Sequence, residues 1–133
     1  MSTNGVGRSE GCTFCRRLDR GDLLAANDLA VAFPAGFPVS PGHALIVPRR
    51  HEPDFFALTP AEQAALITLV NPVCAVLGER HRPDAYNVGV NAGKAAGQTI
   101  LHTHLHVIPR YAGDVPEPRG GIRWVLPETA RYW

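Results

Sequence analysis

The sequence predicts an α+β domain in which an antiparallel sheet of about five strands packs against one main helix. Short apolar runs rich in strand-forming residues alternate with segments rich in glycine and proline. One further segment combines a helix start signal with helical periodicity. The 133 residues contain no internal repeat and no linker, so they suit a single domain.

The predicted strands follow from local composition. Residues 29–33 and 44–47 are apolar, and residues 34–42 between them are too rich in proline and glycine for a central strand. We therefore expect two antiparallel strands joined by a wide loop. The remaining predicted strands are residues 86–91, residues 101–108 and, as an edge strand, residues 122–126.

The main helix is predicted to begin after Thr59. Thr59 can cap it, Pro60 suits the first helical position, and Glu62 completes a capping box. The apolar stripe that follows consists of Leu66, Leu69, Val70, Val73 and Leu77. Pro72 falls inside this pattern, so we expect the helix to kink or restart there. Cys74 lies beside the stripe and is predicted to be a small buried apolar residue.

Composition excludes several classes of protein. The net charge of +1 argues against broad electrostatic binding of nucleic acids, and 45% hydrophobic residues exclude intrinsic disorder. No apolar run approaches the roughly 20 residues that span a bilayer. Residues 1–10 are polar, so we expect a flexible tail, no signal peptide and a cytoplasmic protein without a membrane partner. Residues 11–133 form the predicted domain, with a C-terminal tail from about residue 112.

Three histidines in one predicted strand carry the chemistry. Alternation along a strand places His102, His104 and His106 on one face, with successive residues about 6.5–7 Å apart. Thr103, Leu105 and Val107 then face the core. The histidine row is compatible with a merely solvated face, with a catalytic zinc site, with nucleophilic catalysis by a neutral imidazole, or with ligand binding without turnover. Three histidines at alternate positions of one strand converge poorly on one metal ion. The sequence does not separate the last two alternatives, which are catalysis by a neutral imidazole and ligand binding without turnover.

The loop before this strand favours an anionic ligand. Its glycines permit close approach of the backbone, and its side chains can donate hydrogen bonds to phosphate oxygens. The spacing does not match an ATP-binding P-loop. The residues concerned are Asn91, Gly93, Lys94, Gly97, Gln98 and Thr99.

Two motifs together resemble the histidine triad (HIT) superfamily of nucleotide hydrolases and transferases. The first is the row of alternating histidines at 102–106, preceded by Gln98, Thr99 and Asn91. The second is the segment 41–51, a strand that ends in two arginines and a histidine. The resemblance covers roughly residues 12–111 and implies an enzyme that cleaves a nucleoside phosphoanhydride or phosphoramidate at the α-phosphorus. Dinucleoside polyphosphates and adenylate-like compounds are the substrate classes that it suggests.

The resemblance also implies roles for individual residues. His104 is expected to attack phosphorus and form a nucleotidyl-histidine, and His106 is expected to contact the phosphate. Gln98 and Thr99 are expected to assist catalysis by donating hydrogen bonds. The predicted nucleotide-binding residues are Asn91, Gln98, Thr99, His104, His106, Asn27 and Phe33. Ala35 stands where many members carry the Asp or Asn that holds the ribose, so we expect either that Asn27 or Asp28 holds the ribose or that ribose recognition is weak.

Cys12 and Cys15 form a Cys-x-x-Cys pair in a chain with three cysteines. The pair is compatible with unrelated buried thiols, with redox chemistry or with metal binding, and no βαβ pattern follows to support a thioredoxin-like site. Some bacterial proteins that the chain resembles use such a pair with two histidines, which here are His51 and His102. The resemblance therefore implies one structural zinc per chain, bound by Cys12, Cys15, His51 and His102.

The other histidines and the C-terminal aromatic residues receive plainer interpretations. His43 is predicted to be structural, and His81 is predicted to complement the charge at the end of the helix. Trp124 and Trp133 suit either a dimer interface or closure of the pocket. We expect a homodimeric enzyme, and a nucleotide-binding regulatory protein with little turnover is the alternative function.

Overall fold

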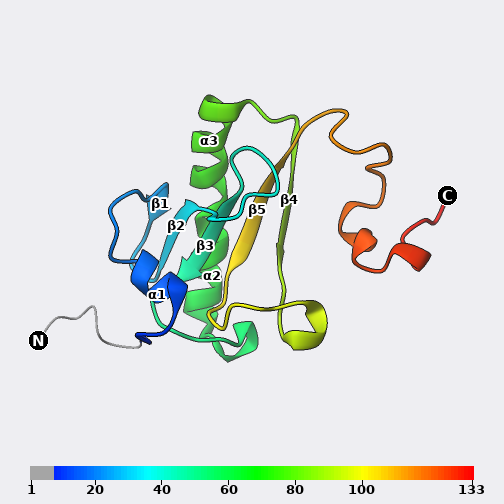
Figure 1. Ribbon diagram of the computed structural model, residues 1–133. Coiled ribbons are helices and arrows are strands. Elements are labelled where there is room, and N and C mark those ends of the chain that lie inside the picture. Colours follow the sequence, from blue (N-terminus) through cyan, green and yellow to red (C-terminus); the bar gives the residue numbers. More distant parts are fainter. Residues whose placement is uncertain (1–7) are drawn as a thin grey trace, which may run out of the picture.

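The computed structural model describes residues 8–133. Five antiparallel strands form one sheet in the order β1-β2-β3-β5-β4, and the helices lie on its two faces (Figure 1). The strands are β1 (Ala25–Ala26), β2 (Ala30–Pro34), β3 (Ala44–Pro48), β4 (Ala85–Val90) and β5 (Leu105–Arg110). This arrangement confirms the predicted fold class.

The helices α2 (Pro60–Thr68) and α3 (Val70–His81) cover one face of the sheet. Both halves of the predicted capping box form, because Thr59 accepts from the Glu62 amide and the Glu62 carboxylate accepts from the Thr59 amide. The helix ends at Thr68 and restarts at Val70, so that Pro72 lies in a first turn, where proline is tolerated. Taken together, α2 and α3 (Pro60–His81) are long and apolar enough to cross a membrane by length and composition alone, which differs from the expectation that no stretch of the sequence reaches that length.

The buried apolar residues of these helices belong to the core of the domain. Leu66, Val73 and Leu77 pack against the sheet together with Ile46 and Val107. Burying side chains of this size stabilises a fold by about 1.5–3 kcal/mol each. The apolar stripe is therefore that of a core helix. Cys74 is half-buried and packs against the same cluster.

The short helix α1 (Thr13–Arg17) covers part of the opposite face. Phe14 and Cys15 pack there against Phe33, Leu45 and Val47. The predicted flexible tail falls mostly on residues 1–7, which lie outside the described residues. Arg8 and Ser9 are held, since Arg8 binds the Asp19 carboxylate at 2.7 Å and the Ser9 amide donates to the Cys15 sulfur.

The histidine segment departs from the predicted strand. Strand β5 begins only at Leu105, because the backbone amide of Thr103 donates to the carbonyl of Glu52 at 2.8 Å instead of joining the sheet. The Thr103 hydroxyl donates to the same carbonyl. His102 and His104 therefore lie in the approach to the strand, and only His106 lies within it.

The C-terminal segment also differs from the prediction. Residues expected to form an edge strand instead form the short 3-10 helix η4 (Gly121–Val125), followed by η5 (Pro127–Thr129). Glycines 120 and 121 both have positive φ angles, which turn the chain at the start of η4. The segment extends away from the helices on the β4 side of the sheet (Figure 1).

Candidate active site and metal centre

Four imidazole rings form a continuous group on the α1 face of the sheet. The ring centroids of His104 and His106 are 5.0 Å apart, and those of His43 and His106 are 5.2 Å apart. His102 lies at the other end, with its backbone carbonyl 2.8 Å from Nδ1 of His104. The structure therefore brings the three predicted histidines together and adds His43 to them.

Backbone groups fix the tautomers of this group. Nδ1 of His104 donates to the His102 carbonyl, which leaves Nε2 of neutral His104 with a free lone pair. The Val39 amide donates to Nδ1 of His43 at 3.1 Å, so neutral His43 carries its proton on Nε2. That Nε2 is 2.9 Å from Nδ1 of His106 and donates to it. Neutral His106 consequently carries its own proton on Nε2.

Burial keeps these rings neutral. The pKa values of His43 and His104 are lowered, mainly because burial disfavours the charged imidazolium. Burial, reinforced by His104 and His43, lowers the pKa of His106 to about 4. At neutral pH the group therefore presents a lone pair on His104 and a hydrogen-bond donor on His106. This is the arrangement needed by a nucleophile and an adjacent group that binds a phosphate oxygen.

Phe14 closes one side of this group. Its ring centroid lies 4.9 Å from that of His104 and 5.7 Å from that of Phe33. Phe33 is only 2% exposed, and the Arg17 guanidinium lies 4.5 Å above its ring. Phe33 is therefore on the histidine face, and the Phe14 ring lies next to both Phe33 and His104.

The glycine-rich loop places its predicted residues in different surroundings. Asn91 lines a cavity together with His43 and His106. Thr99 is exposed and lines another cavity, beside Cys12 and His51. The Gln98 amide hydrogens bind the carbonyls of Pro53 and Ile100, and its oxygen accepts from the Gly93 amide. In this structure the Gln98 side chain holds the loop in shape.

Asn27 lies away from the histidines. Its side chain donates to the Ala65 carbonyl on α2 and accepts from the amides of Leu29 and Ala30. These bonds tie the β1–β2 turn to the helix layer. All of these partners of Asn27 are backbone groups of the fold. The structure does not place Asn27 near the histidines where a nucleotide is predicted to bind.

Four side chains form a second group at the His102 end. The ligand atoms of Cys12, Cys15, His51 and His102 all lie within 4.8 Å of one another. Nδ1 of His102 is 3.5 Å from each cysteine sulfur, and Nδ1 of His51 is 3.4 Å from the Cys15 sulfur. A tetrahedral ion with usual bond lengths to sulfur and nitrogen separates such ligands by about 3.5 Å. The residues therefore fit a four-coordinate metal.

Hydrogen bonds outside this group orient its ligands. Nε2 of His102 donates to the Pro48 carbonyl at 2.8 Å, which directs the Nδ1 lone pair towards the two sulfurs. The Cys15 amide donates to the Cys12 sulfur, and the Ser9 amide donates to the Cys15 sulfur. These donors suit thiolates. Two thiolates and two neutral imidazoles would balance the charge of a divalent cation.

Most of the chain matches a known protein family. A model of the HIT domain matches residues 19–113. The chain belongs to the HIT family. This confirms the predicted family, and the fold agrees with those of solved HIT proteins.

Three relatives illustrate the family around this chain. An uncharacterized HIT-like protein of Saccharolobus solfataricus is 34% identical over 77% of this chain and 76% of its own length. An asymmetrical bis(5′-nucleosyl)-tetraphosphatase of Schizosaccharomyces pombe is 40% identical over 67% of this chain and 49% of its own length. A Zn-bound histidine triad protein of Mycobacterium smegmatis has a TM-score of 0.69 and 30% identity, covering 78% of each chain. The relatives whose activity is named are nucleotide hydrolases or phosphorylases. They support the prediction that this chain is an enzyme of the nucleotide hydrolase or transferase class.

His43 is the residue of the site that sequence reasoning missed. The pairing of β3 with β5 places Leu45 opposite His106, and side chains two residues apart point to the same face of a strand. His43 therefore lies on the histidine face, next to His106. The pairing of these two strands is the signal that would have revealed it.

Proposed function

We propose that this HIT enzyme cleaves nucleoside phosphoanhydrides or phosphoramidates at the α-phosphorus through a nucleotidyl intermediate on His104. One observation carries the proposal: Nδ1 of buried His104 is bonded to the His102 carbonyl, so its Nε2 has a free lone pair. The adjacent Nε2–H of His106 supplies a donor to a phosphate oxygen. The tetraphosphatase activity named for the fission yeast relative supports the reaction class.

The reaction proceeds in two steps. Nε2 of His104 forms a bond to phosphorus while the bond between phosphorus and the leaving group breaks. The leaving group keeps that electron pair and takes a proton from solvent. Water then attacks phosphorus, the bond to His104 breaks, and a proton returns to solvent as the nucleoside monophosphate leaves. The overall reaction consumes one water, and His104 ends as it began.

The neighbouring residues of His104 stabilise the intermediate. Once phosphorylated on Nε2, the imidazole carries positive charge, and its Nδ1–H faces the His102 carbonyl at 2.8 Å. Hydrogen bonds to charged groups contribute about 1.5–3 kcal/mol. The His102 carbonyl therefore both orients the nucleophile and stabilises its cationic form.

The test of this proposal is the variant His104→Ala. With an adenosine phosphoramidate as substrate, we expect kcat to fall by about a thousandfold or more, because the covalent step is lost. The affinity of the variant for adenosine monophosphate, measured by calorimetry, should stay within about threefold of the wild-type value, because other hydrogen-bond donors surround the position of the lost imidazole ring. Wild-type turnover in the variant would refute the nucleophile. A wild-type protein that binds the nucleotide but turns over no substrate would instead support the regulatory alternative.

We further propose that the metal held by Cys12, Cys15, His51 and His102 is a structural zinc, one per chain. Two sulfur and two nitrogen ligands close a tetrahedral site and leave no position for a substrate. The zinc named for the Mycobacterium smegmatis neighbour supports this choice. Through His102, the ion would stiffen the backbone whose carbonyl orients His104. It would also link the N-terminal segment to the approach of β5.

We also propose that the enzyme is a homodimer. Strand β4 is at the edge of the sheet, and an exposed strand edge with six residues is a template for pairing with a second chain. The C-terminal segment on that side exposes large apolar residues, including Val125 at 74%. Light scattering should give a mass of twice 14.4 kDa. A mass of one chain at micromolar concentration would contradict this proposal.

A further inference from the structure

A cavity of about 470 Å³ opens beside the proposed metal centre. Two of the four ligands, Cys12 and His51, form part of its wall. The rest of the wall comes from the N-terminal segment and from the loop before His102, with hydroxyl groups at Ser9, Thr13 and Thr99. We call this space the Cys12 cavity.

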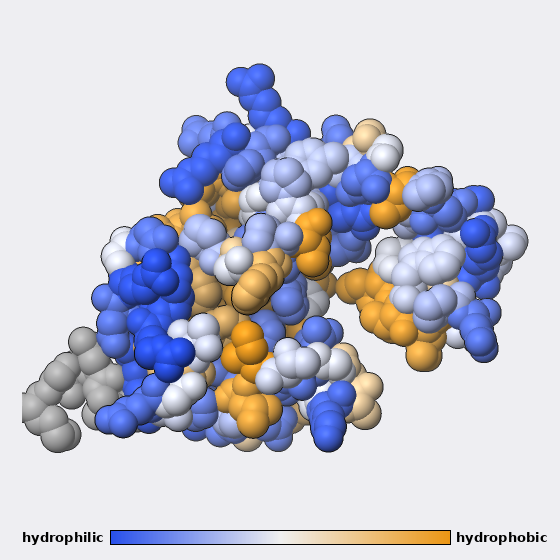
Figure 2. All heavy atoms as spheres, in the orientation of Figure 1, coloured by the Kyte–Doolittle hydropathy of each residue, from blue (hydrophilic) through white to orange (hydrophobic). Residues whose placement is uncertain are grey.

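The Cys12 cavity gives small molecules a path to one sulfur of the cysteine pair. Cys12 lines it and is 8% exposed, whereas Cys15 is 3% exposed and does not line it. Among the described residues of its wall there is no carboxylate, ammonium or guanidinium group. The surface over α1 is mostly hydrophilic (Figure 2), and the hydroxyl groups of the wall suit a polar guest. A small, uncharged, water-soluble reagent therefore meets Cys12 before Cys15.

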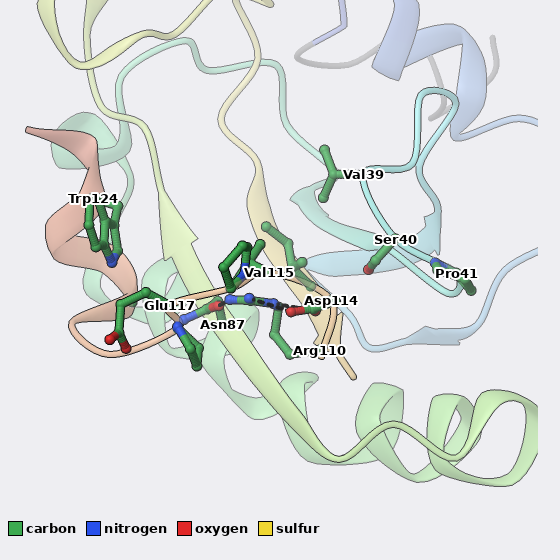
Figure 3. A pocket seen from close by; sticks show the side chains of 13 residues that line it. Val39, Ser40, Pro41, Asn87, Arg110, Asp114, Val115, Glu117 and Trp124 are labelled. Atoms are coloured by element: carbon green, nitrogen blue, oxygen red, sulfur yellow. Dashed lines mark hydrogen bonds and ion pairs between the residues drawn. The ribbon is translucent and has the colours of Figure 1, made fainter. Parts of the chain in front are cut away.

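A larger cavity, of about 750 Å³ beside the C-terminal segment, has no thiol among its described lining residues (Figure 3). Its charged side chains include Arg110, which is already bonded to both carboxylate oxygens of Asp114 at 2.8 Å. The third cysteine, Cys74, packs against the α2–α3 side of the sheet, opposite to Cys12. Of these two cavities, only the Cys12 cavity leads to a thiol.

The two sulfurs of Cys12 and Cys15 are placed to react with each other. They lie within 4.8 Å, because Cys12 caps α1 and Cys15 lies in its first turn. The Cys15 amide donates to the Cys12 sulfur at 3.4 Å, and the Ser9 amide donates to the Cys15 sulfur at 3.3 Å. Such donors favour the thiolate, which is the form that attacks an oxidant. Cys74 lies on the other face of the sheet, so Cys15 is the thiol available to Cys12.

A change at the two sulfurs reaches the nucleophile by two routes. Phe14 lies between the cysteines in the chain, and its ring centroid is 4.9 Å from that of His104. Nδ1 of His102 lies 3.5 Å from each sulfur, and the His102 carbonyl accepts from His104 at 2.8 Å. A disulfide joins Cβ atoms about 1 Å closer than neighbours on one helix turn, so it would draw the first turn of α1 together. The oxidation state of the pair is therefore coupled to the position of His104.

We propose that Cys12 is an oxidation site, at which a small peroxide converts Cys12 and Cys15 to a disulfide, removes two ligands from the metal and lowers turnover at His104. This rests on the proposed metal centre and adds regulation to the proposed enzyme. A chain in this oxidised form offers the metal only His51 and His102.

The oxidation proceeds in two steps. The Cys12 thiolate attacks one oxygen of hydrogen peroxide, the O–O bond breaks, and Cys12 becomes a sulfenic acid as hydroxide leaves. The Cys15 thiolate then attacks the Cys12 sulfur, the S–O bond breaks, and a second hydroxide leaves. The two thiolates lose two electrons in all. Hydrogen peroxide gains these electrons and, with two protons from solvent, becomes two waters.

Metal release tests the first part of the proposal. Zinc-loaded wild-type protein should hold its metal against a chromogenic chelator, and hydrogen peroxide should then release about one zinc per chain. Peptide mapping should find the bond between Cys12 and Cys15. Cys74→Ser is the matched control and should release zinc at the wild-type rate. Zinc that stays bound at peroxide concentrations that fully oxidise free cysteine would overturn the inference. A wild-type protein that binds no zinc would overturn the metal centre, and the inference with it.

Dimedone, which traps sulfenic acids, identifies the sulfur that reacts first. In wild-type protein treated briefly with peroxide and dimedone, we expect the adduct on Cys12. The adduct should accumulate in Cys15→Ala, which lacks the second thiol. In Cys12→Ala, the adduct on Cys15 should form at least about tenfold more slowly than that on Cys12, because Cys15 is more buried. Equal rates, or an adduct on Cys15 in the wild-type protein, would overturn the assignment of Cys12.

Turnover tests the coupling to His104. As the disulfide forms, we expect kcat for an adenosine phosphoramidate to fall at least about tenfold, and dithiothreitol with added zinc should restore it to within about twofold. Fully oxidised protein with an unchanged kcat would overturn the coupling, as would activity that reduction and zinc do not restore. A wild-type protein without turnover before oxidation would instead overturn the proposed enzyme, while zinc release would still report the oxidation of Cys12.

Discussion

Nε2 of His43 lies 2.9 Å from Nδ1 of His106, although 63 residues separate the two in the chain. The Val39 amide holds the other nitrogen of His43 as an acceptor. His43 must therefore donate to His106, which leaves the proton of neutral His106 on its Nε2. His43 thus acts as a positioning residue for the tautomer of His106.

Removing this donor should impair turnover more than binding. We expect His43→Leu to lower kcat by about 10²-fold, comparable to the loss of one preorganised donor, with a smaller effect on KM. His43→Gln keeps an N–H that can reach His106 and should recover part of the loss. Steady-state kinetics of the two variants measure this difference. Equal kcat values in His43→Leu and the wild-type protein would contradict the tautomer argument.

The metal centre can be removed without touching the nucleophile. Elemental analysis of untagged wild-type protein should find about one zinc ion per chain, and Cys12→Ser should lose it. It should also melt at a lower temperature, because metal binding contributes to folding. His106→Ala should keep its metal. Loss of zinc from His106→Ala but not from Cys12→Ser would contradict the division into two sites.

Much of this architecture could be predicted because its signals are local. The capping box at Thr59 and Glu62, the restart before Pro72 and the apolar strands β2 and β3 each depend on residues close in sequence. The departures depend on distant partners. Because Thr103 donates to the Glu52 carbonyl, β5 begins only at Leu105. No pattern within residues 101–108 indicates that bond.

The site shows the same division. The alternating histidines and the cysteine pair are visible as motifs, and the structure brings Cys12, Cys15, His51 and His102 together. The hydrogen-bond partners of Gln98 and His43 are distant in the sequence, so they become apparent only in the folded structure. The sequence predicts that the Gln98 side chain donates to a phosphate. In the structure its amide hydrogens bind the carbonyls of Pro53 and Ile100. The sequence predicts a structural role for His43. In the structure, the pairing of β3 and β5 places His43 beside His106.

An ion pair at the start of α2 should give the fold a measurable acid sensitivity. Arg50 makes two 2.9 Å hydrogen bonds to Glu62 and lowers the pKa of that carboxyl from 4.5 to about 2. Because the folded state holds the carboxylate more strongly, this contribution is present above pH 4.5 and is lost as pH falls towards 2. Arg50 is 41% exposed, so solvent screening limits the contribution to about 1–2 kcal/mol.

The variant Glu62→Gln measures this contribution. Its free energy of unfolding should lie below that of the wild-type protein at pH 7, and the difference should shrink between pH 4.5 and 2. Urea titrations at several pH values supply the measurement. Glu79→Gln, at an exposed position on α3, is the control and should change stability by less than about 0.5 kcal/mol. A difference for Glu62→Gln that does not vary with pH would contradict the ion-pair argument.

The covalent intermediate on His104 is the central claim, and intact-mass spectrometry of the rapidly quenched enzyme tests it directly. With an adenosine phosphoramidate, we expect the wild-type protein to gain the mass of one adenylyl group, located on His104 by peptide fragmentation. His104→Ala should show no such gain. An adduct on another residue, or full turnover with direct transfer to water and no adduct at any quench time, would contradict the proposed mechanism.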